Sequence, residues 1–238
     1  MALLELKKVK KIYLQGKIEV PALRGIDLAV EEGEFTALFG PSGSGKTTLL
    51  NMIGCLDTPT EGDIFLNNSR ISTLSKKELA LTRRYNIGFI FQNYNLIPVL
   101  TAYENVEFAI RLIGGLSETE VRKVVLKMLA EVGLEGKENR KPGELSGGEK
   151  QRVAIARALV KKPKIVLADE PTANLDSETG QEVIKIMIKM NKELGTTFIF
   201  STHDPQIMER AIRFINLKDG VIFSDRREEE NVQHTACT

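Results

Sequence analysis

The 238-residue sequence predicts an α/β fold with a mixed central sheet, an N-terminal antiparallel β subdomain and an inserted helical subdomain. Three observations lead to this prediction. A glycine-rich loop at residues 40–48 separates a short apolar run from a helical pattern. A continuous apolar run at residues 165–168 is typical of a parallel strand that is buried on both faces. Helical patterns fill residues 93–145 and interrupt the alternation of strands and helices.

The first part of the chain is expected to be rich in strands. Residues 4–13 combine spaced apolar positions with lysines, as in a half-exposed strand, and a second short strand is expected at residues 26–30. These two segments predict the antiparallel N-terminal part. The elements expected up to Gln92 are strands at residues 35–39, 63–66 and 87–91 and helices at residues 46–54 and 76–84.

Helices and strands alternate again after the helical stretch. Ser117 and Glu120 fit a capping box, which predicts the start of a helix at residues 118–132. The chain from Asp225 onward is charged and then polar, and we expect it to be disordered. The other expected elements are helices at 102–113, from 146 to about 162 and at 177–194, and strands at 165–170, 196–200, 212–217 and 221–224.

We expect a single domain that covers residues 1–238. Residues 1–92 and 146–224 would form an α/β core together with the antiparallel β subdomain. Residues from about 93 to 145 would form the helical subdomain, and residues 225–238 would be a flexible tail.

The overall composition is compatible with most classes of globular protein, whereas the cysteine content indicates the cellular compartment. Charged residues make up 27 % and hydrophobic residues 42 % of the chain, an ordinary globular mixture. The net charge of +1 gives no reason to expect nucleic acid as a partner. Cys55 and Cys237 lie far apart and fit no metal or disulfide framework, which is typical of a reducing compartment.

Neither a leader peptide nor a membrane span is expected. The first residues reach charge too early for a signal peptide. No apolar run approaches the roughly 18 residues that a membrane-spanning helix needs. If the function involves a membrane, another chain must cross it.

The loop at residues 40–48 fits the phosphate-binding pattern G-x-x-x-x-G-K-[ST]. Its glycines allow positive φ, so that backbone N–H groups can turn toward an anion at the start of the following helix. Lys46 would neutralise the β- and γ-phosphates of a nucleoside triphosphate, and the Thr47 hydroxyl would bind Mg²⁺. An ordinary glycine-rich turn is the alternative, which the strand–loop–helix context disfavours. The expected phosphate-binding residues are Gly40, Pro41, Ser42, Gly43, Ser44, Gly45, Lys46, Thr47 and Thr48.

Polar side chains follow three of the expected buried strands. Asp169 closes an apolar strand and is a candidate Mg²⁺ ligand, and Glu170 beside it is the candidate general base for water. Gln92 could contact Mg²⁺ or orient the water. The alternatives are carboxylates that cap a loop and a polar strand end. His203 also follows a strand, and a lone histidine is usually a satisfied polar residue.

A second anion site is possible where Ser146, Gly147 and Gly148 precede a helix. Only one complete phosphate loop is present in the chain. Ser146 therefore either caps its own helix or binds the triphosphate that another copy of the chain holds. Spacing alone does not decide between these two roles.

Together these residues resemble the ATPase subunit of an ABC transporter over residues 4–224. The most specific part of the resemblance is Leu145, Ser146, Gly147 and Gly148 (the signature segment), followed by the helical motif at residues 151–159. The resemblance implies a head-to-tail dimer that holds two ATP molecules between the phosphate loop of one chain and the signature segment of the other. Glu149 and Ala173 depart slightly from the family pattern.

The resemblance also implies roles for single residues. Tyr13 would stack on adenine, Gln92 would sense Mg²⁺ and relay to a membrane subunit, and Asp176 would line the dimer interface. His203 would contact the γ-phosphate, as would Ser146 and Gly148 from the opposite subunit. The expected catalytic residues are Glu170, His203, Gln92 and Lys46, the metal ligands Thr47, Gln92 and Asp169, and the cofactors ATP and Mg²⁺.

Residues 51–62 and 95–102 resemble more narrowly the ATPases of lipoprotein release, macrolide export and antimicrobial-peptide resistance. This subfamily implies an integral membrane permease with an extracytoplasmic domain, docked near residues 92–115. The ATPase would then be cytoplasmic, at the inner face of the cell membrane, without inserting into it. A cell-division-type ATPase that gates its partner is the main alternative. The single cassette disfavours ABC proteins of DNA repair or translation, and the short C-terminal end disfavours an importer.

Overall fold

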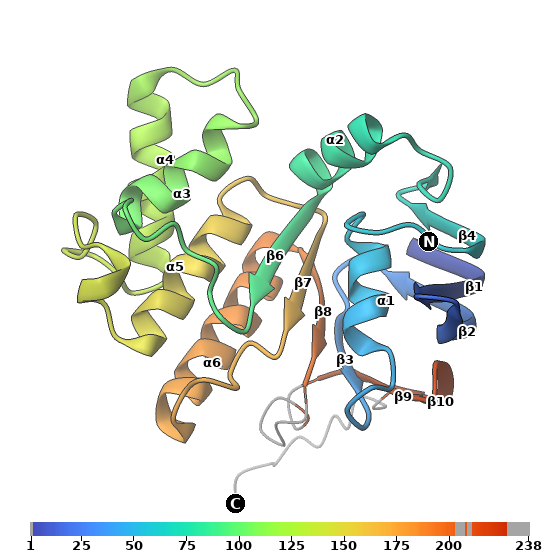
Figure 1. Ribbon diagram of the computed structural model, residues 1–238. Helices are drawn as coiled ribbons and strands as arrows, with labels where there is room; N and C mark the ends of the chain where they lie inside the picture. Colours follow the sequence, from blue (N-terminus) through green and yellow to red (C-terminus); the bar gives the residue numbers. More distant parts are fainter. Residues whose placement is uncertain (1, 203–207, 209–210, 228–238) are drawn as a thin grey trace, which may run out of the picture.

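The computed structural model describes residues 2–202, 208 and 211–227, which form two β-sheets with helices packed against them (Figure 1). The strands are β1 (Ala2–Gln15), β2 (Ile18–Glu31), β3 (Phe35–Phe39), β4 (Glu61–Leu66), β5 (Ser69–Arg70), β6 (Ile87–Phe91), β7 (Ile165–Asp169), β8 (Thr197–Ser201), β9 (Arg213–Lys218) and β10 (Val221–Arg227). The α-helices are α1 (Lys46–Ile53), α2 (Lys76–Asn86), α3 (Ala102–Arg111), α4 (Glu118–Glu131), α5 (Gly147–Leu159) and α6 (Ser177–Leu194), and Pro142–Glu144 is a 3₁₀ turn.

The larger sheet has six strands in the order β10-β9-β3-β8-β7-β6. Its strands run parallel from β9 to β6, whereas β10 pairs antiparallel with β9. The smaller sheet has the order β2-β1-β4-β5, and all its pairs are antiparallel. The predicted α/β fold with a mixed central sheet and an N-terminal antiparallel sheet is thereby confirmed.

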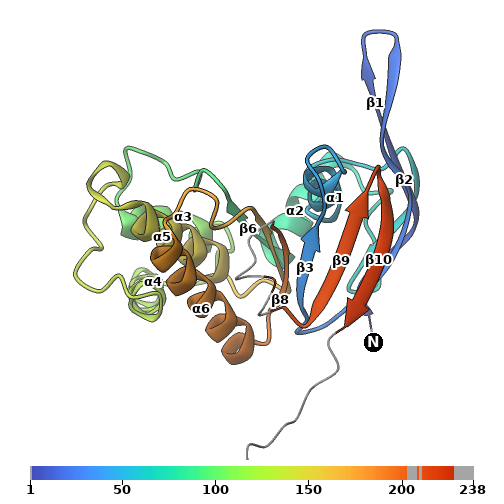
Figure 2. The ribbon, with the colours of Figure 1, turned by 90° about the horizontal axis from the view of Figure 1, so that it is seen from below.

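The larger sheet is buried on both faces. In β7, Val166 and Ala168 belong to the hydrophobic cluster shared with α3–α6, whereas Ile165 and Leu167 belong to the cluster around α1 and the smaller sheet. Successive side chains of a strand point to opposite faces, so a strand between two apolar layers must be apolar throughout. Figures 1 and 2 show these two layers on either side of the sheet.

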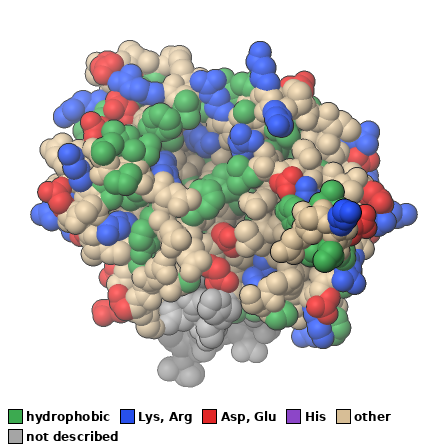
Figure 3. Space-filling view, viewed as in Figure 1, with side chains coloured by type: hydrophobic (Ala, Val, Ile, Leu, Met, Phe, Trp, Pro, Cys, Tyr) green, Lys and Arg blue, Asp and Glu red, His purple; other side chains and the backbone are tan. Residues whose placement is uncertain are grey.

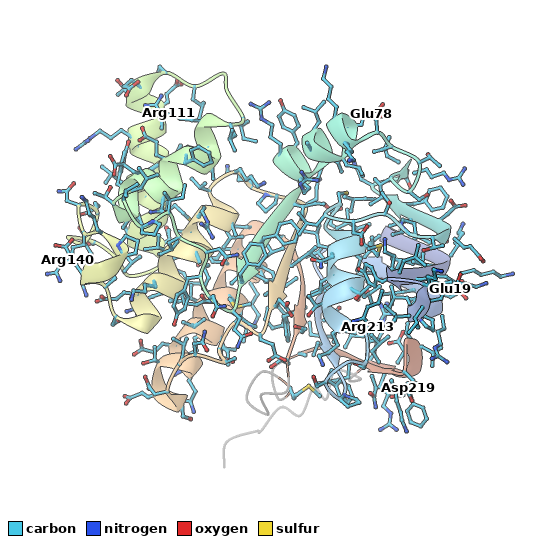
Figure 4. The ribbon with its side chains drawn as sticks, in the orientation of Figure 1. Glu19, Glu78, Arg111, Arg140, Arg213 and Asp219 are labelled. Atoms are coloured by element: carbon cyan, nitrogen blue, oxygen red, sulfur yellow. The ribbon has the colours of Figure 1, made fainter. Side chains whose placement is uncertain are left out.

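The predicted helical stretch forms part of one of these layers. Ser117 and Glu120 form the predicted capping box at the start of α4. Arg111, at the end of α3, bonds to Glu107 and Glu118 and so joins α3 to the start of α4 (Figure 4). Both helices share one hydrophobic cluster with α5 and α6. The division into a core and an inserted subdomain therefore stays a prediction.

The two N-terminal strands are longer than expected. They form a hairpin that projects beyond the rest of the structure (Figure 2) and carries Glu19 near its tip (Figure 4). Antiparallel pairing continues to Gln15 opposite Ile18, although Leu14 is 74 % exposed. Backbone hydrogen bonds extend this hairpin past the residues that contribute to the core, which explains why the apolar pattern placed its end too early.

The expected start of the tail at Asp225 is wrong. Strand β10 continues to Arg227, because Asp225 pairs with an arginine from the neighbouring strand. Arg213 is only 6 % exposed. Its guanidinium donates to both Asp225 carboxylate oxygens, at 2.8 and 2.6 Å, and to Glu34 at 3.0 Å. A buried charge requires such partners. The rest of the expected tail, residues 228–238, lies outside the described residues.

Candidate active site

A pocket of about 610 Å³ lies at the carboxyl ends of the central strands. This is the edge at which parallel α/β sheets generally bind ligands. It brings together residues from four separate parts of the chain. The residues that line it are those at 40–48 together with Ala22, Gln92, Asp169, Glu170 and Ala173.

The loop between β3 and α1 has the conformation that its glycines predicted. Gly40, Gly43 and Gly45 have φ angles of +146°, +77° and +102°. A Cβ atom at Gly40 would lie 1.9 Å from the Leu217 carbonyl oxygen, and one at Gly45 would lie 2.7 Å from the Ala22 carbonyl oxygen. Only glycine therefore fits these two positions without a shift of the backbone.

The Lys46 ammonium lies over this loop. Its Nζ donates to the carbonyl oxygens of Gly40 at 2.8 Å and Pro41 at 3.1 Å. Helix α1 begins after Gly45, without a side-chain cap and without an acidic residue in its first turn. The unpaired N–H groups at a helix start and the nearby ammonium both favour a bound anion.

The Thr47 hydroxyl and the Asp169 carboxylate, both predicted as metal ligands, meet across the pocket. Thr47 Oγ1 donates to Asp169 Oδ2 at 3.1 Å. The Ser201 hydroxyl, at the end of β8, donates to the other oxygen of the same carboxylate. Hydroxyl and carboxylate oxygens are the hard ligands that Mg²⁺ prefers, so these residues fit the predicted metal.

Glu170 lies in the pocket immediately after Asp169, in an unusual backbone conformation. Its φ is +48°, a region that non-glycine residues rarely adopt. Its N–H group donates to the carbonyl oxygen of Ser201 at 3.1 Å and to the Ser201 hydroxyl at 3.2 Å. Strand β8 therefore holds both acidic residues of the site through one serine.

Gln92 lines the same pocket on the other side of β7. The side chain of Asn174, from the loop that follows Glu170, donates to the Gln92 carbonyl oxygen at 2.9 Å and to Asn93 Oδ1 at 3.0 Å. The segments that carry Gln92 and Glu170 are thus tied together.

Tyr13 is not among the residues that line the pocket, but it contacts the end of the phosphate loop. Its hydroxyl donates to Asp57 Oδ2 at 3.0 Å, and the Thr48 side chain lies close to it. The Lys11 ammonium lies 4.9 Å from the ring centroid. Burial, together with Asp57, raises the pKa of the Tyr13 phenol. Tyr13 as a residue is 38 % exposed, so it keeps an accessible surface.

Ser146 caps its own helix, which is one of the two roles left open above. Its Oγ accepts the N–H of Glu149 at 3.2 Å, and the Glu149 carboxylate accepts the N–H of Ser146 at 2.8 Å. Glu149 also pairs with Lys137. This ion pair, followed by the bond from Ser146, lowers the pKa of the Glu149 carboxyl. A glutamate is therefore well accommodated where the family pattern often has glutamine.

The glycines of the signature segment lie in close packing with neighbouring side chains. A Cβ atom at Gly148 would lie 2.2 Å from Thr179 Cγ2, and one at Gly147 would lie 3.1 Å from the Tyr94 hydroxyl. Asp176 caps α6 by accepting the Thr179 N–H at 2.9 Å, and this bond lowers the pKa of its carboxyl.

The signature segment does not line the pocket around the phosphate loop of its own chain. Within the described part of the chain, Ser146, Gly147, Gly148 and Asp176 are all absent from that lining. Their second possible role, in the site of another copy, stays a prediction.

One predicted site residue cannot be placed, and three contacts were not predicted. His203 lies outside the described residues. The bonds from Ser201 to Asp169, from Asn174 to Gln92 and from Gln151 to Pro171 depend on which strands and helices are neighbours. The only local signal for Ser201 is its place at the end of an apolar strand.

Comparisons with known proteins indicate the same family that the sequence motifs resemble. Residues 23–173 match the family model described as ABC transporter. The chain is 47 % identical over 231 residues to the uncharacterized ABC transporter ATP-binding protein MJ0796 of Methanocaldococcus jannaschii, covering 96 % of this chain and 97 % of that protein. The dimeric structure of MJ0796 bound to ADP and Pi has a TM-score of 0.88 and 46 % identity, covering 95 % of this chain and 99 % of that chain.

Two further relatives have names that state a lipoprotein-releasing system and macrolide export. The lipoprotein-releasing system ATP-binding protein LolD of Idiomarina loihiensis is 43 % identical over 225 residues, covering 94 % of this chain and 98 % of that protein. The macrolide export ATP-binding/permease protein MacB of Escherichia coli is 48 % identical over 224 residues, covering 94 % of this chain and 34 % of that protein. The chain thus spans about a third of the length of this longer relative. Within the described residues, no helix has the length and apolar composition needed to cross a membrane.

Proposed function

This chain belongs to the ABC transporter family as an ATPase of the LolD and MacB type, and from that premise we propose that it powers a membrane permease by ATP-driven, head-to-tail dimerisation. The permease would export or extract its substrate. The names of LolD and MacB, which state lipoprotein release and macrolide export for those proteins, support this proposal. It would also carry an extracytoplasmic domain and hold the ATPase at the inner face of the cell membrane.

One observation carries the proposal. The phosphate loop, Asp169 and Glu170 share one pocket, whereas the capped start of α5 does not line it. A triphosphate in this pocket would therefore need a second chain to bring a signature segment against its γ-phosphate. The dimer described for MJ0796 supports this arrangement.

In the proposed reaction, Lys46 and the N–H groups of the loop bind the β- and γ-phosphates. The Glu170 carboxylate accepts a proton from a water molecule as the water oxygen bonds to the γ-phosphorus. The bond between the γ-phosphorus and the bridging oxygen breaks, and ADP and phosphate leave. Thr47, Gln92 and Asp169 would hold Mg²⁺, which when bound neutralises charge on the phosphates.

The remaining assigned residues would act around this centre. Gln92 would orient the water, His203 would contact the γ-phosphate, and Tyr13 would stack on the adenine ring through its accessible face. Asp176 would lie at the interface between the two copies. Residues 93–145 would form a helical subdomain beside the core.

Replacing Ser146 with arginine tests the trans role of the signature segment. The exposed Ser146 would face the γ-phosphate of the other copy, so a bulky side chain should block ATP-driven dimerisation while each monomer still binds ATP. The measurement is solution mass by light scattering in a background that cannot hydrolyse ATP, with nucleotide binding followed in parallel.

Ser146→Thr is the matched control, because threonine keeps the cap of α5. Dimers that form equally well with Ser146→Arg would contradict the trans role, and a loss of monomer binding would show that the variant is simply misfolded.

A second pocket, of about 490 Å³, offers a docking site for the permease. It lies between α2, β6, α3 and the end of α5, and Figure 3 shows this hollow with hydrophobic side chains along it and lysine or arginine side chains beside it. Its apolar lining includes Phe89, Phe108 and Leu112. The stretch at residues 92–115, predicted to contact the partner, forms one side of it.

The charge of this pocket indicates an acidic partner segment. It is lined by Arg83, Arg84, Arg157 and Lys161, and no aspartate or glutamate is among its lining residues. Burial, followed by the nearby Arg83 guanidinium, lowers the pKa of Lys161 to about 8. The buried Arg84 Nε has no hydrogen-bond partner in the described part of the chain. A carboxylate on the permease would stabilise the buried charge of Lys161 and would give Arg84 a hydrogen-bond acceptor.

Replacing Arg84 with glutamate should lower recovery of the permease with this chain about tenfold, because a like charge would then face the acidic segment. The measurement is a pull-down from detergent-solubilised membranes, with the permease identified by mass spectrometry. Lys76→Glu, on the same helix but outside the pocket lining, is the control. Equal recovery with both variants would contradict the acidic docking segment.

A further inference from the structure

Gln151 is a buried amide that the proposed reaction does not use. It lies in the second turn of α5 and is 0 % exposed. Its Nε2 donates to the Pro171 carbonyl oxygen at 2.8 Å. Since that carbonyl can only accept, the amide oxygen must point elsewhere, and it has no hydrogen-bond partner in the described part of the chain. A buried amide with an unsatisfied oxygen destabilises the fold, so packing alone does not account for this glutamine.

The bonded carbonyl belongs to the residue that follows Glu170. The strained φ of +48° at Glu170 persists only where the surrounding contacts enforce it. On the upstream side, Ser201 accepts the Glu170 N–H. On the downstream side, proline has no N–H group to offer, so its carbonyl is the backbone group through which the next peptide can be oriented, and Gln151 binds it.

The same helix carries the signature segment. Gln151 lies three residues after Gly148, so both face the same side of α5, where Gly148 packs against Thr179 at the start of α6. Helix α5 therefore contacts this region at two points. Gly148 packs against the Thr179 side chain in the first turn of α6, and Gln151 bonds to Pro171 in the loop that leads to α6.

We propose that Gln151 is a positioning residue for Glu170. Through its bond to the Pro171 carbonyl oxygen, Gln151 holds the Glu170 carboxylate where it can accept a proton from water. This inference rests on the general-base role given to Glu170 above. It also implies that any displacement of α5, when its signature segment engages the ATP of the other copy, is transmitted to the base in its own site.

Two substitutions remove this contact in different ways. Gln151→Met keeps the length and volume of the side chain but has no donor, and Gln151→Asn keeps the amide but is one methylene too short. Each should lower kcat about ten- to a hundredfold, the size of effect expected when a reacting group is misplaced. KM for ATP and the affinity of the monomer for a fluorescent ATP analogue should stay within about twofold, since no phosphate-binding group moves.

A double-mutant cycle with Glu170→Gln separates positioning from a general structural role. If Gln151 acts through Glu170, Gln151→Met should lower the residual rate of Glu170→Gln by less than about twofold. An equal loss in both backgrounds would overturn the inference. Val125→Ala is the control for stability, because it removes buried volume from the hydrophobic cluster that α4 shares with α5. It should lower the melting temperature and leave kcat unchanged.

The outcomes also distinguish this inference from the proposed function. If Glu170→Gln alone leaves turnover intact, the base assignment fails and Gln151 has nothing to position. If Glu170→Gln abolishes turnover while both Gln151 variants retain full kcat, only the positioning role is wrong. Should Gln151→Met not fold, the asparagine variant provides the same test.

Discussion

Replacing Glu170 with glutamine is expected to lower ATP turnover by about 10²–10⁴-fold, the usual contribution of a general base, and to leave ATP binding intact. Glutamine has almost the same shape as glutamate but cannot accept the proton from water. The N–H group of this residue donates to Ser201, and the substitution leaves that group unchanged. Because glutamine also keeps the shape of the side chain, we expect the pocket to keep its geometry.

The same variant is suited to a measurement of solution mass, by size exclusion with light scattering, with and without ATP. Because ATP is bound but not consumed, the two-chain complex should accumulate, and the mass should shift from monomer to dimer. Glu193→Gln makes the same chemical change on the exposed end of α6 and should hydrolyse ATP normally.

Two other outcomes would change the assignment. Unchanged turnover would remove Glu170 from the role of base. A monomer under both conditions would mean either that the permease supplies the energy of closure or that the signature segment has no trans role. Addition of the permease would tell these two apart, since only the first predicts a dimer in its presence.

Replacing Lys46 with alanine should raise the Kd for ATP about 10²-fold or more, as expected when one partner of a desolvated charge pair is removed. The loss has two causes. The ammonium would no longer neutralise the phosphates. The carbonyl groups of Gly40 and Pro41 would also lose their common hydrogen-bond donor, which stabilises the conformation of the loop.

Titration with a fluorescent ATP analogue measures this effect. Lys46→Met separates the charge from the size of the side chain, and it should bind as weakly as the alanine variant if charge dominates. Lys185→Ala, on the exposed side of α6, should bind ATP normally. Retained micromolar affinity in Lys46→Ala would disprove the role of the loop in phosphate binding.

Much of the local structure was predictable because it depends on residues that are close in sequence. Strand β3 and the first residue of α1 lie where the phosphate-loop pattern placed them, and α6 has the predicted bounds. The capping box of Ser117 and Glu120 forms as its spacing indicated. Positive φ at three loop glycines followed from the motif. Each of these features is a short-range property of the chain, such as a backbone dihedral angle, a helix cap or a turn.

The predictions that failed concern boundaries that long-range partners decide. The tail was expected to start at Asp225, but the buried Arg213 guanidinium binds that carboxylate and extends β10. The hairpin of β1 and β2 extends beyond its apolar residues because backbone pairing continues. In both cases the deciding contact joins different strands, and a local pattern does not report it.

The sequence by itself determined that this chain has a phosphate-binding loop, two acidic residues at the end of a buried strand and a serine–glycine–glycine helix start of the signature type. Only the tertiary structure decided how these parts meet. The order of the sheet places β8 between β3 and β7, which brings Thr47 within 3.1 Å of Asp169 across 122 residues and sets Ser201 beside both acids. Helix packing likewise carries Gln151 to Pro171. Strand order and helix packing follow from burying the apolar faces of all the elements at once, which is a property of the whole chain rather than of any motif.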